Sequence, residues 1–203
     1  MPSQVTLAIG KVWVEFRQTD WTDDVMHTNA IGRYNEYLRI KGYNMNFPPS
    51  AQNYLIKALK GTPTVLERLV KDHGPEDPIW DFSPDPLRFS LREVVAHLAD
   101  WEPIWLERFT RANTESRPFL PSVDEGQLAI TGDYKHRDPV ACVAAYKSGR
   151  IKLVSYLESL GTADWNKIAE REFVGPLTIQ MMATYVLSHD GYHLAQVVEW
   201  LEM

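Results

Sequence analysis

The chain has 203 residues, of which 44% are hydrophobic and 24% are charged, as in an ordinary globular protein. The formal net charge of -6 gives no basic surface for duplex nucleic acid, whose binding depends on neutralising phosphates. The single cysteine excludes a disulfide scaffold, and the sequence has neither a run of 18 apolar residues nor a signal-peptide pattern, so we expect a cytoplasmic protein without nucleic-acid or membrane partners.

The first 50 residues differ from the rest of the sequence and are expected to form an N-terminal extension. Residues 12–16 combine β-branched and aromatic side chains, which favours a short strand. Residues 29–41 place apolar side chains at helical spacing and could form a short helix. Two prolines then mark a break within residues 44–50. We therefore divide the chain into an extension, residues 1–50, and a domain, residues 51–203.

The domain is expected to be all-α, a bundle of four helices. The first helix covers about residues 51–73, with Gly61-Thr62-Pro63 as a kink or short break. The second begins at Ser90, which forms a capping box with Glu93, and continues to about residue 112. A proline inside this second helix predicts a bend.

The third and fourth helices follow a long connection over residues 113–137. The third begins with Asp138 followed by a proline, ends at Gly161, and carries an apolar stripe that includes Ile151. The fourth begins at Thr178 and runs to the C-terminus. Four helices with one long crossover form a known bundle topology, which is the fold we expect.

Two histidines occupy the apolar stripe of the fourth helix. His189 and His193 follow Met182 and Val186 at steps of three and four, so both are expected on the buried face. Imidazoles at positions i and i+4 point the same way and can bind one cation. A pair of core histidines satisfied by hydrogen bonds is the alternative.

A third histidine, His97, lies between Val94 and Trp101 on or beside the inward face of the second helix. Three imidazoles from two helices would leave a coordination position for water or substrate, which is typical of catalytic metal sites. Imidazole ligands suit Zn, Ni, Fe or Mn, so the sequence does not select the metal. A di-iron centre is not favoured, because the sequence has no Glu-x-x-His.

Two segments carry a resemblance to a known family. Residues 90–102, SLREVVAHLADWE, and residues 187–196, LSHDGYHLAQ, resemble the DinB/YfiT superfamily of small bacterial proteins. The resemblance covers about residues 51–203 and implies a four-helix bundle whose three histidines bind a divalent metal. It also implies a homodimer that acts as a metal-dependent hydrolase or as a transferase of low-molecular-weight thiols to small electrophilic molecules.

Two further polar residues are candidates for the site. Asp100 follows His97 by three residues and could orient an imidazole or accept a proton from bound water, although a solvated carboxylate is the simpler interpretation. Gln196 follows His193 by three residues and could line the pocket or form a polar edge of the core. Cys142 is expected to be a buried structural thiol, since no neighbour in the sequence would lower its pKa.

Two functional hypotheses follow. In the first, the protein is an enzyme whose metal activates water or a thiol, and Trp101, Trp105 and Tyr192 either line its pocket or belong to the core. In the second, the metal only stabilises the bundle, and the protein acts in a stress response through a dimer or a partner. A fourth protein ligand would favour the second hypothesis, whereas an open coordination position favours the first.

Overall fold

The computed structural model describes residues 4–9, 12–17, 49–85 and 87–202. Its strands and α-helices are β1 (Gln4–Ile9), β2 (Val12–Arg17), α2 (Pro49–Val70), α3 (Leu91–Thr114), β3 (Phe119–Leu120), α4 (Glu125–Thr131), α5 (Pro139–Glu158), β4 (Ile168–Arg171), β5 (Gly175–Thr178) and α6 (Ile179–Glu202). Three short 3-10 helices are η2 (Pro78–Asp81), η3 (Tyr134–His136) and η4 (Asp164–Asn166). None of the described helices is long and apolar enough to cross a membrane.

The chain divides into two compact units, residues 1–45 with 173–175 and residues 46–172 with 176–203. In the first unit, β1 and β2 form an antiparallel pair in which Ile9 lies opposite Val12. This pair confirms the strand expected at residues 12–16. The helix expected at residues 29–41 lies outside the described residues.

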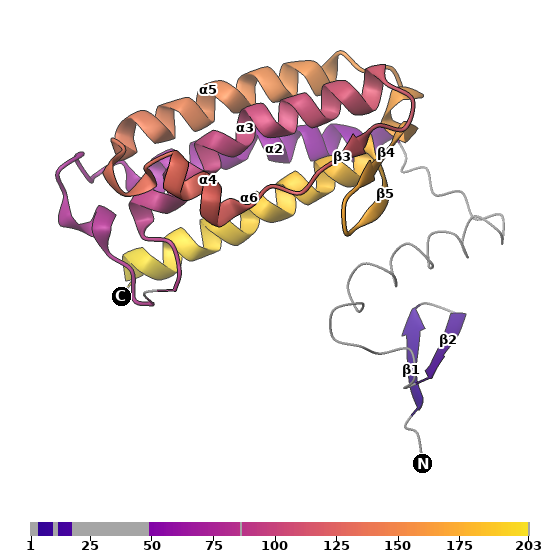
Figure 1. The fold of residues 1–203 in the computed structure, drawn as a ribbon, viewed down its shortest axis with the longest axis horizontal. Helices are drawn as coiled ribbons and strands as arrows, with labels where there is room; N and C mark the ends of the chain where they lie inside the picture. Colours follow the sequence, from indigo (N-terminus) through magenta and orange to yellow (C-terminus); the bar gives the residue numbers. More distant parts are fainter. Residues whose placement is uncertain (1–3, 10–11, 18–48, 86, 203) are drawn as a thin grey trace. The chain divides into compact units, whose positions relative to one another are not determined.

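Four long helices form the bundle of the second unit. Helix α3 packs against α5 and α6, and α2 packs against the same two helices, so α2 and α3 lie diagonally opposite. Figure 1 shows α3 and α5 running in the same direction. Two parallel neighbours need a connection that returns along the whole bundle, and the segment after α3 provides it. The expected four-helix bundle with one long crossover is therefore confirmed.

The connections hold ordered elements that the sequence did not reveal. The crossover contains β3, α4 and η3, and the chain between α5 and α6 forms β4 and β5 (Figure 1). Strand β3 pairs in parallel with β4, and the three strands form a small sheet in the order β3-β4-β5. These strands have two to four residues each, which is too short to show an alternating pattern in a sequence.

The predicted helix starts are confirmed by their caps. At α3, the Ser90 hydroxyl accepts a bond from the Glu93 amide, and the Glu93 carboxylate accepts one from the Ser90 amide at 2.8 Å. Asp138 caps α5 in the same way through its side chain. The Thr178 hydroxyl accepts a bond from an amide in the first turn of α6 at 3.1 Å. Each cap satisfies amides that have no partner within their helix.

Helix α2 continues through Pro63, so the expected interruption does not occur as a break. Proline at this position removes the amide that would donate to the carbonyl of Leu59, four residues earlier. That carbonyl instead accepts a bond from Arg150 Nη1 of α5 at 3.2 Å. The Thr62 hydroxyl also lies 3.2 Å from this carbonyl, so a local side chain and one from a neighbouring helix take the place of the missing backbone donor. The helix ends at Val70, three residues earlier than expected.

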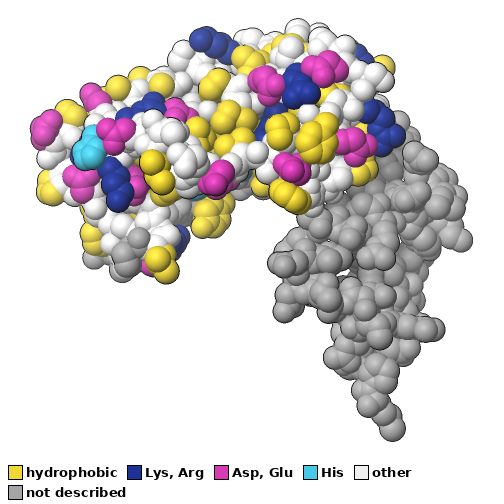
Figure 2. Space-filling view, in the orientation of Figure 1, with side chains coloured by type: hydrophobic (Ala, Val, Ile, Leu, Met, Phe, Trp, Pro, Cys, Tyr) yellow, Lys and Arg dark blue, Asp and Glu magenta, His cyan; other side chains and the backbone are white. Residues whose placement is uncertain are grey.

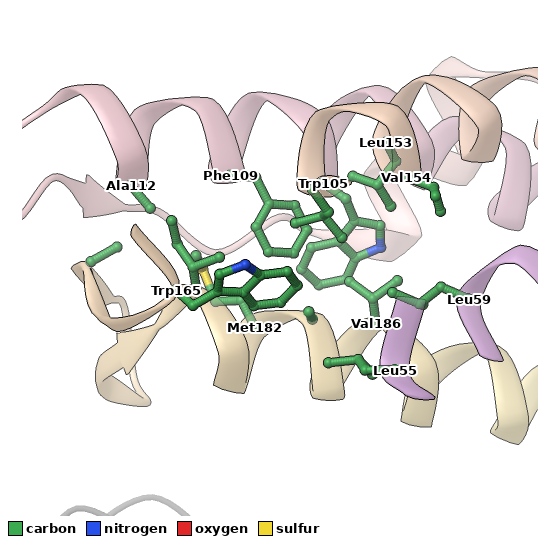
Figure 3. Packing of buried hydrophobic residues seen from close by; sticks show 14 of the residues in the cluster. Leu55, Leu59, Trp105, Phe109, Ala112, Leu153, Val154, Trp165, Met182 and Val186 are labelled. Carbon is green, nitrogen blue, oxygen red and sulfur yellow. The ribbon is translucent and has the colours of Figure 1, made fainter. Parts of the chain in front are cut away.

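The core lies between the four helices. Figure 3 shows Trp105 and Phe109 projecting from α3 toward Met182 and Val186 of α6. All four side chains are buried. A second buried cluster surrounds Trp200 nearer the C-terminal end of α6. Figure 2 shows acidic and basic side chains interspersed over the visible face of the bundle.

The expected stripe of α5 is wrong at one position. Ile151 is 62% exposed, whereas its neighbour Arg150 is 2% exposed and points into the bundle. The pattern of apolar residues favoured isoleucine because a charged residue is rarely buried without partners. Arg150 has such partners, and they lie beside the candidate site.

Candidate metal centre

The three predicted histidines converge between α3 and α6. His97 of α3 and His193 of α6 are buried, and the His189 side chain is 13% exposed. His189 and His193 are one turn apart on the same face of α6, and α3 packs against that face. The spacing read from the sequence therefore brings the three rings together.

One ring nitrogen of each histidine lies close to the ring nitrogens of the other two. One nitrogen from each histidine lies within 4.8 Å of the other two. Nε2 of His97 and Nε2 of His189 are 3.0 Å apart. The ring centroid of His193 is 4.7 Å from that of His97 and 4.6 Å from that of His189. Among the described residues, no fourth His, Cys, Asp or Glu joins this group.

Gln196 orients one of the three rings. Its Oε1 lies 3.2 Å from Nδ1 of His193, while its Nε2 donates to the backbone carbonyl of Phe89 at 3.4 Å. Because the amide donates to Phe89, its oxygen faces the imidazole and accepts the Nδ1 proton. The Nε2 lone pair of His193 is then free to face the other two rings. The structure thus places Gln196 at the Nδ1 side of His193, one of the predicted metal ligands.

Burial keeps the three imidazoles neutral at physiological pH. It lowers the pKa of His97 to about 2 and that of His189 to about 4, with neighbouring histidines adding to each effect. Burial also lowers the pKa of His193, against the opposing effect of the hydrogen bond that its Nδ1 donates to Gln196. A neutral imidazole offers a lone pair, which is the form that binds a metal ion.

Aromatic rings surround the histidines. Phe89 and Trp101 lie with ring centroids 5.4 Å and 5.9 Å from that of His97, and Trp101 lies 5.6 Å from His189. Nδ1 of His97 and Nδ1 of His189 are buried and have no hydrogen-bond partner among the described residues. An apolar wall around the nitrogens lowers the local dielectric and strengthens any charge bound there.

Asp100 contacts an arginine and not an imidazole. Its Oδ1 accepts a bond from Arg137 Nη1 at 2.6 Å, and both side chains are about one-third exposed or less. No hydrogen bond joins Asp100 to His97 within the described part of the chain, so the orienting role expected from the sequence has no contact to support it. A role as proton acceptor stays a prediction.

A buried polar network, here called the Arg150 network, lies one residue from His189. Its members are Arg150, Glu102, Asp190, Thr62 and Tyr146, one or two from each of the four bundle helices. Arg150 Nη2 donates to Glu102 Oε1 at 2.6 Å and to Asp190 Oδ1 at 3.0 Å. The network therefore joins all four helices at the level of the histidines.

Thr62 completes this network. Its hydroxyl accepts bonds from Tyr146 at 3.0 Å and from Arg150 at 2.8 Å, and donates to Asp190 at 2.7 Å. Every hydrogen-bonding site of the hydroxyl is thus used. Burial raises the pKa of Glu102 to about 7, and the nearby charge of Asp190 acts in the same direction, against the opposing hydrogen bonds and charge of Arg150. Asp190 follows His189 directly, so the network fixes the backbone that carries a candidate ligand.

Sequence reasoning missed this network, although one signal for it was present. Arg150 lies four residues after Tyr146 and four before Val154, which is a stripe position of α5. A charged residue on a buried stripe needs a partner of opposite charge from another helix. The sequence does not show which helix supplies it.

Of the remaining candidates, only Tyr192 lies beside the centre, with its ring centroid 5.1 Å from that of His193. Cys142 is buried, and burial raises the pKa of its thiol, as expected for a structural cysteine. His73 and His136 bond to nearby aspartates, and Tyr192 is 61% exposed. His27 lies outside the described residues.

The donor set fits a divalent metal ion. Three neutral imidazoles close together suit the metals expected from the sequence, Zn, Ni, Fe or Mn, and the Gln196 bond is the kind of contact that fixes a ligand ring. Three protein ligands without a fourth are the pattern of catalytic sites. The geometry can therefore hold a metal with a coordination position that no described residue fills.

Comparisons with known proteins point in the same direction. The sequence model of the DinB superfamily matches residues 58–197, more than half of the chain. A Bacillus licheniformis protein named "Putative metal-dependent hydrolase" is 30% identical over 115 residues, which are 54% of this chain and 62% of that protein. The match thus spans less than two thirds of that relative's length.

A solved structure shows the same fold. It is described as "YfiT from Bacillus subtilis is a probable metal-dependent hydrolase with an unusual four-helix bundle topology". The match has a TM-score of 0.71 at 21% identity and covers 77% of this chain and 89% of the other. At this identity the likeness supports the arrangement of helices.

Proposed function

The chain belongs to the DinB superfamily, and from this premise we propose that it is a metal-dependent hydrolase of a small molecule. The convergence of three imidazole nitrogens within 4.8 Å carries the proposal. Three-histidine sites of this kind occur in enzymes that activate water.

In this proposal, His97, His189 and His193 hold one divalent metal ion. The ion, when bound, supplies Lewis-acid chemistry to a small ligand in its remaining position. Gln196 keeps Nε2 of His193 unprotonated by accepting the proton of Nδ1. The surrounding indole rings exclude water from the nitrogens and strengthen the electrostatic interactions made there.

The absence of a fourth ligand from the described residues favours catalysis over a purely structural metal. The fold also has its own stabilising contacts at this level, because the Arg150 network joins all four helices without a metal. A metal-stabilised stress-response protein remains the alternative, and it requires a further ligand from outside the described residues.

Thiol transfer is the second reaction class to be tested. A low-molecular-weight thiol would take the position of water and lose its proton to solvent. Its thiolate would then form a C–S bond to an electrophilic carbon, while the leaving group would depart with the electron pair of the bond that breaks. Hydrolysis proceeds without added thiol, whereas transfer depends on it. An assay from which the thiol is left out therefore distinguishes the two reactions. The homodimer implied by the family resemblance is tested by analytical ultracentrifugation.

The experiment uses protein purified without a nickel column, freed of metal and then reloaded with Zn, Mn, Fe or Ni. We expect turnover of ester and amide probes to return with metal and without thiol. His97→Ala should abolish the recovery, and His136→Ala, which changes an exposed histidine, should not. If turnover required added cysteine as a thiol cosubstrate, thiol transfer would replace hydrolysis as the proposed reaction. Equal turnover with and without metal would contradict the proposal.

A further inference from the structure

Three buried nitrogen donors follow the histidines along α3, and a fourth lies on β4. Trp101 Nε1, Trp105 Nε1, Arg108 Nη1 and Arg171 Nε are all buried and have no hydrogen-bond partner among the described residues. Buried donors in folded proteins are nearly always paired, so four neighbouring exceptions need an explanation. All four are donors, and their missing partner is therefore an acceptor.

Arg108 is the most unusual of the four. It is 3% exposed, and its contact is one bond from Nη2 to the carbonyl of Pro121 at 2.9 Å. No carboxylate of the described residues lies within salt-bridge distance of it. Arg150, which is equally buried, instead binds the two carboxylates of Glu102 and Asp190. A buried guanidinium without a counter-charge is costly, and an anion at this point would remove that cost.

A second arginine adds positive charge at the same place. Burial lowers the pKa of Arg108 to about 10, and the nearby charge of Arg171 lowers it further in the same direction. Burial also lowers the pKa of Arg171, which lies on β4. Glu125 and Glu172 are close enough to influence Arg171, and Glu107 is close enough to influence Arg108, but none of them makes a salt bridge with these arginines in the described structure. Two arginines from different elements therefore face a region without a bound carboxylate.

The two tryptophans connect these arginines to the histidines. The Arg108 guanidinium lies 5.2 Å from the ring centroids of both Trp101 and Trp105. Those two rings are 4.7 Å apart, and Trp101 is 5.6 Å from the ring of His189. Figure 3 shows Trp105 directed from α3 into the bundle. An apolar aromatic surface thus separates a positive end from the candidate metal end.

The group of donors reaches solvent beside α6. Tyr185 lies one turn before His189, and its ring packs edge-on against Trp105 with centroids 5.7 Å apart. Tyr185 is 54% exposed, so its movement would uncover the edge of Trp105. An exposed side chain of this kind rearranges on the nanosecond timescale and does not require the bundle to open.

We propose that Arg108 and Arg171 bind the anionic group, a carboxylate or a phosphate ester, of the small molecule on which the three-histidine centre acts. The apolar part of that molecule lies against Trp101 and Trp105. The inference rests on the proposed function only for the reactive end of the ligand. Arginine suits this task because its planar fork donates two parallel bonds to a carboxylate or phosphate.

The spacing along α3 also limits the length of the ligand. Arg108 follows His97 by eleven positions, which is roughly 16 Å along a helix axis. The Arg108 guanidinium lies closer to the histidines than this rise, because it is 5.2 Å from the ring centroid of Trp101, which is 5.6 Å from that of His189. The distance from the guanidinium to the His189 ring is therefore at most about 11 Å, and the ligand spans no more than that.

Binding of simple anions tests the inference without any knowledge of the reaction. Hexanoate, hexyl phosphate and uncharged hexanamide are titrated into the full chain, with tryptophan fluorescence as the signal. We expect hexanoate or hexyl phosphate to bind saturably, and the stronger of the two identifies the anionic group. Hexanamide should bind at least about tenfold more weakly, since a hydrogen bond to a charged group contributes roughly 1.5–3 kcal/mol.

Variants locate the bound anion. Arg108→Gln and Arg171→Gln should each weaken binding of the preferred anion by about tenfold or more, whereas Arg68→Gln, which removes an exposed arginine of α2, should not. If Arg108→Gln failed to fold, as shown by loss of its circular dichroism signal, anion binding to Arg171→Gln and the comparison with hexanamide would decide whether the anion site exists. Equal binding of hexanamide, no binding of either anion, or unchanged binding in Arg171→Gln would overturn the inference.

Metal content, measured on the same samples, separates this inference from the proposed function. Arg108 and Arg171 lie outside the histidine group, so their variants should keep the metal content of the unmodified chain. Arginine-dependent anion binding in a chain that takes up no metal would uphold the anion site and contradict the metal function. Metal uptake without anion binding would support the metal function and contradict the anion site.

Discussion

Gly149 allows α3 and α5 to approach closely at the level of the Arg150 network. A Cβ atom added at this position would lie 2.5 Å from Cβ and 2.7 Å from Cγ of Glu102. Both of those atoms lie near the backbone of α3, so a change of rotamer cannot move Cβ away. Gly149→Ala must therefore separate the two helices or displace Glu102 from Arg150.

The expected cost follows from opposing effects. Alanine in a helix is favoured over glycine by about 1 kcal/mol. Overpacking costs roughly 1–3 kcal/mol, and weakening a charged hydrogen bond such as the Glu102–Arg150 contact costs roughly 1.5–3 kcal/mol more. We expect the free energy of unfolding to fall by about 2–4 kcal/mol, which for a chain of this size lowers Tm by roughly 5–15 °C.

The measurement is urea unfolding followed by far-UV circular dichroism, with Gly61→Ala as the matched control. Gly61 is also inside a helix, but a Cβ added there has no atom within 4 Å. The control should therefore be more stable than the unmodified chain by about 1 kcal/mol. If Gly149→Ala were stabilised to the same extent as Gly61→Ala, the close approach of α3 and α5 would be refuted.

Three further predictions concern charge, pH and metal. Arg150→Met should lower the free energy of unfolding by about 3–5 kcal/mol, because it leaves two buried carboxylates unpaired, whereas Arg68→Met should change it little in the same urea titration. In metal-free protein, the pKa of His189 is about 4 when folded and about 6.5 when unfolded. The unfolded chain therefore takes up the proton first as the pH falls, and His189 alone should account for about 3 kcal/mol of the stability lost between pH 6.5 and pH 4 in urea titrations at each pH, with the still lower pKa of His97 adding to the loss. His189→Phe should reduce this dependence, and an unchanged dependence would contradict the burial of His189. A chelator should lower Tm but leave a helical protein with a cooperative transition in a thermal circular dichroism scan, and loss of the helices at room temperature would indicate a structural metal instead.

The helices and the three histidines could be predicted because their signals are local. Ser90, Asp138 and Thr178 begin helices through bonds to residues two or three positions away, so their side chains are sufficient evidence. His189 and His193 share a face because they are one turn apart. Their meeting with His97 required only that α3 and α6 be neighbours, which the four-helix bundle allows.

The buried arginines could not be predicted, because their environment comes from distant segments. Arg150 is held by residues 40 and 48 positions away, and Arg108 contacts the crossover at Pro121. A sequence pattern treats both residues as surface charges. The continuity of α2 through Pro63, in place of the break that was one of the two expectations, could not be read for the same reason, since a donor to the carbonyl freed by its missing amide comes from α5.

The central claim is that three histidines hold one metal ion. Its most direct test is the metal content of the folded chain after equilibrium dialysis against Zn, measured by elemental mass spectrometry. We predict one ion per chain, and sharply reduced content in His97→Ala, His189→Ala and His193→Ala. His136→Ala, which removes an exposed histidine, should retain the full content. Equal metal content in all four variants would contradict the assignment.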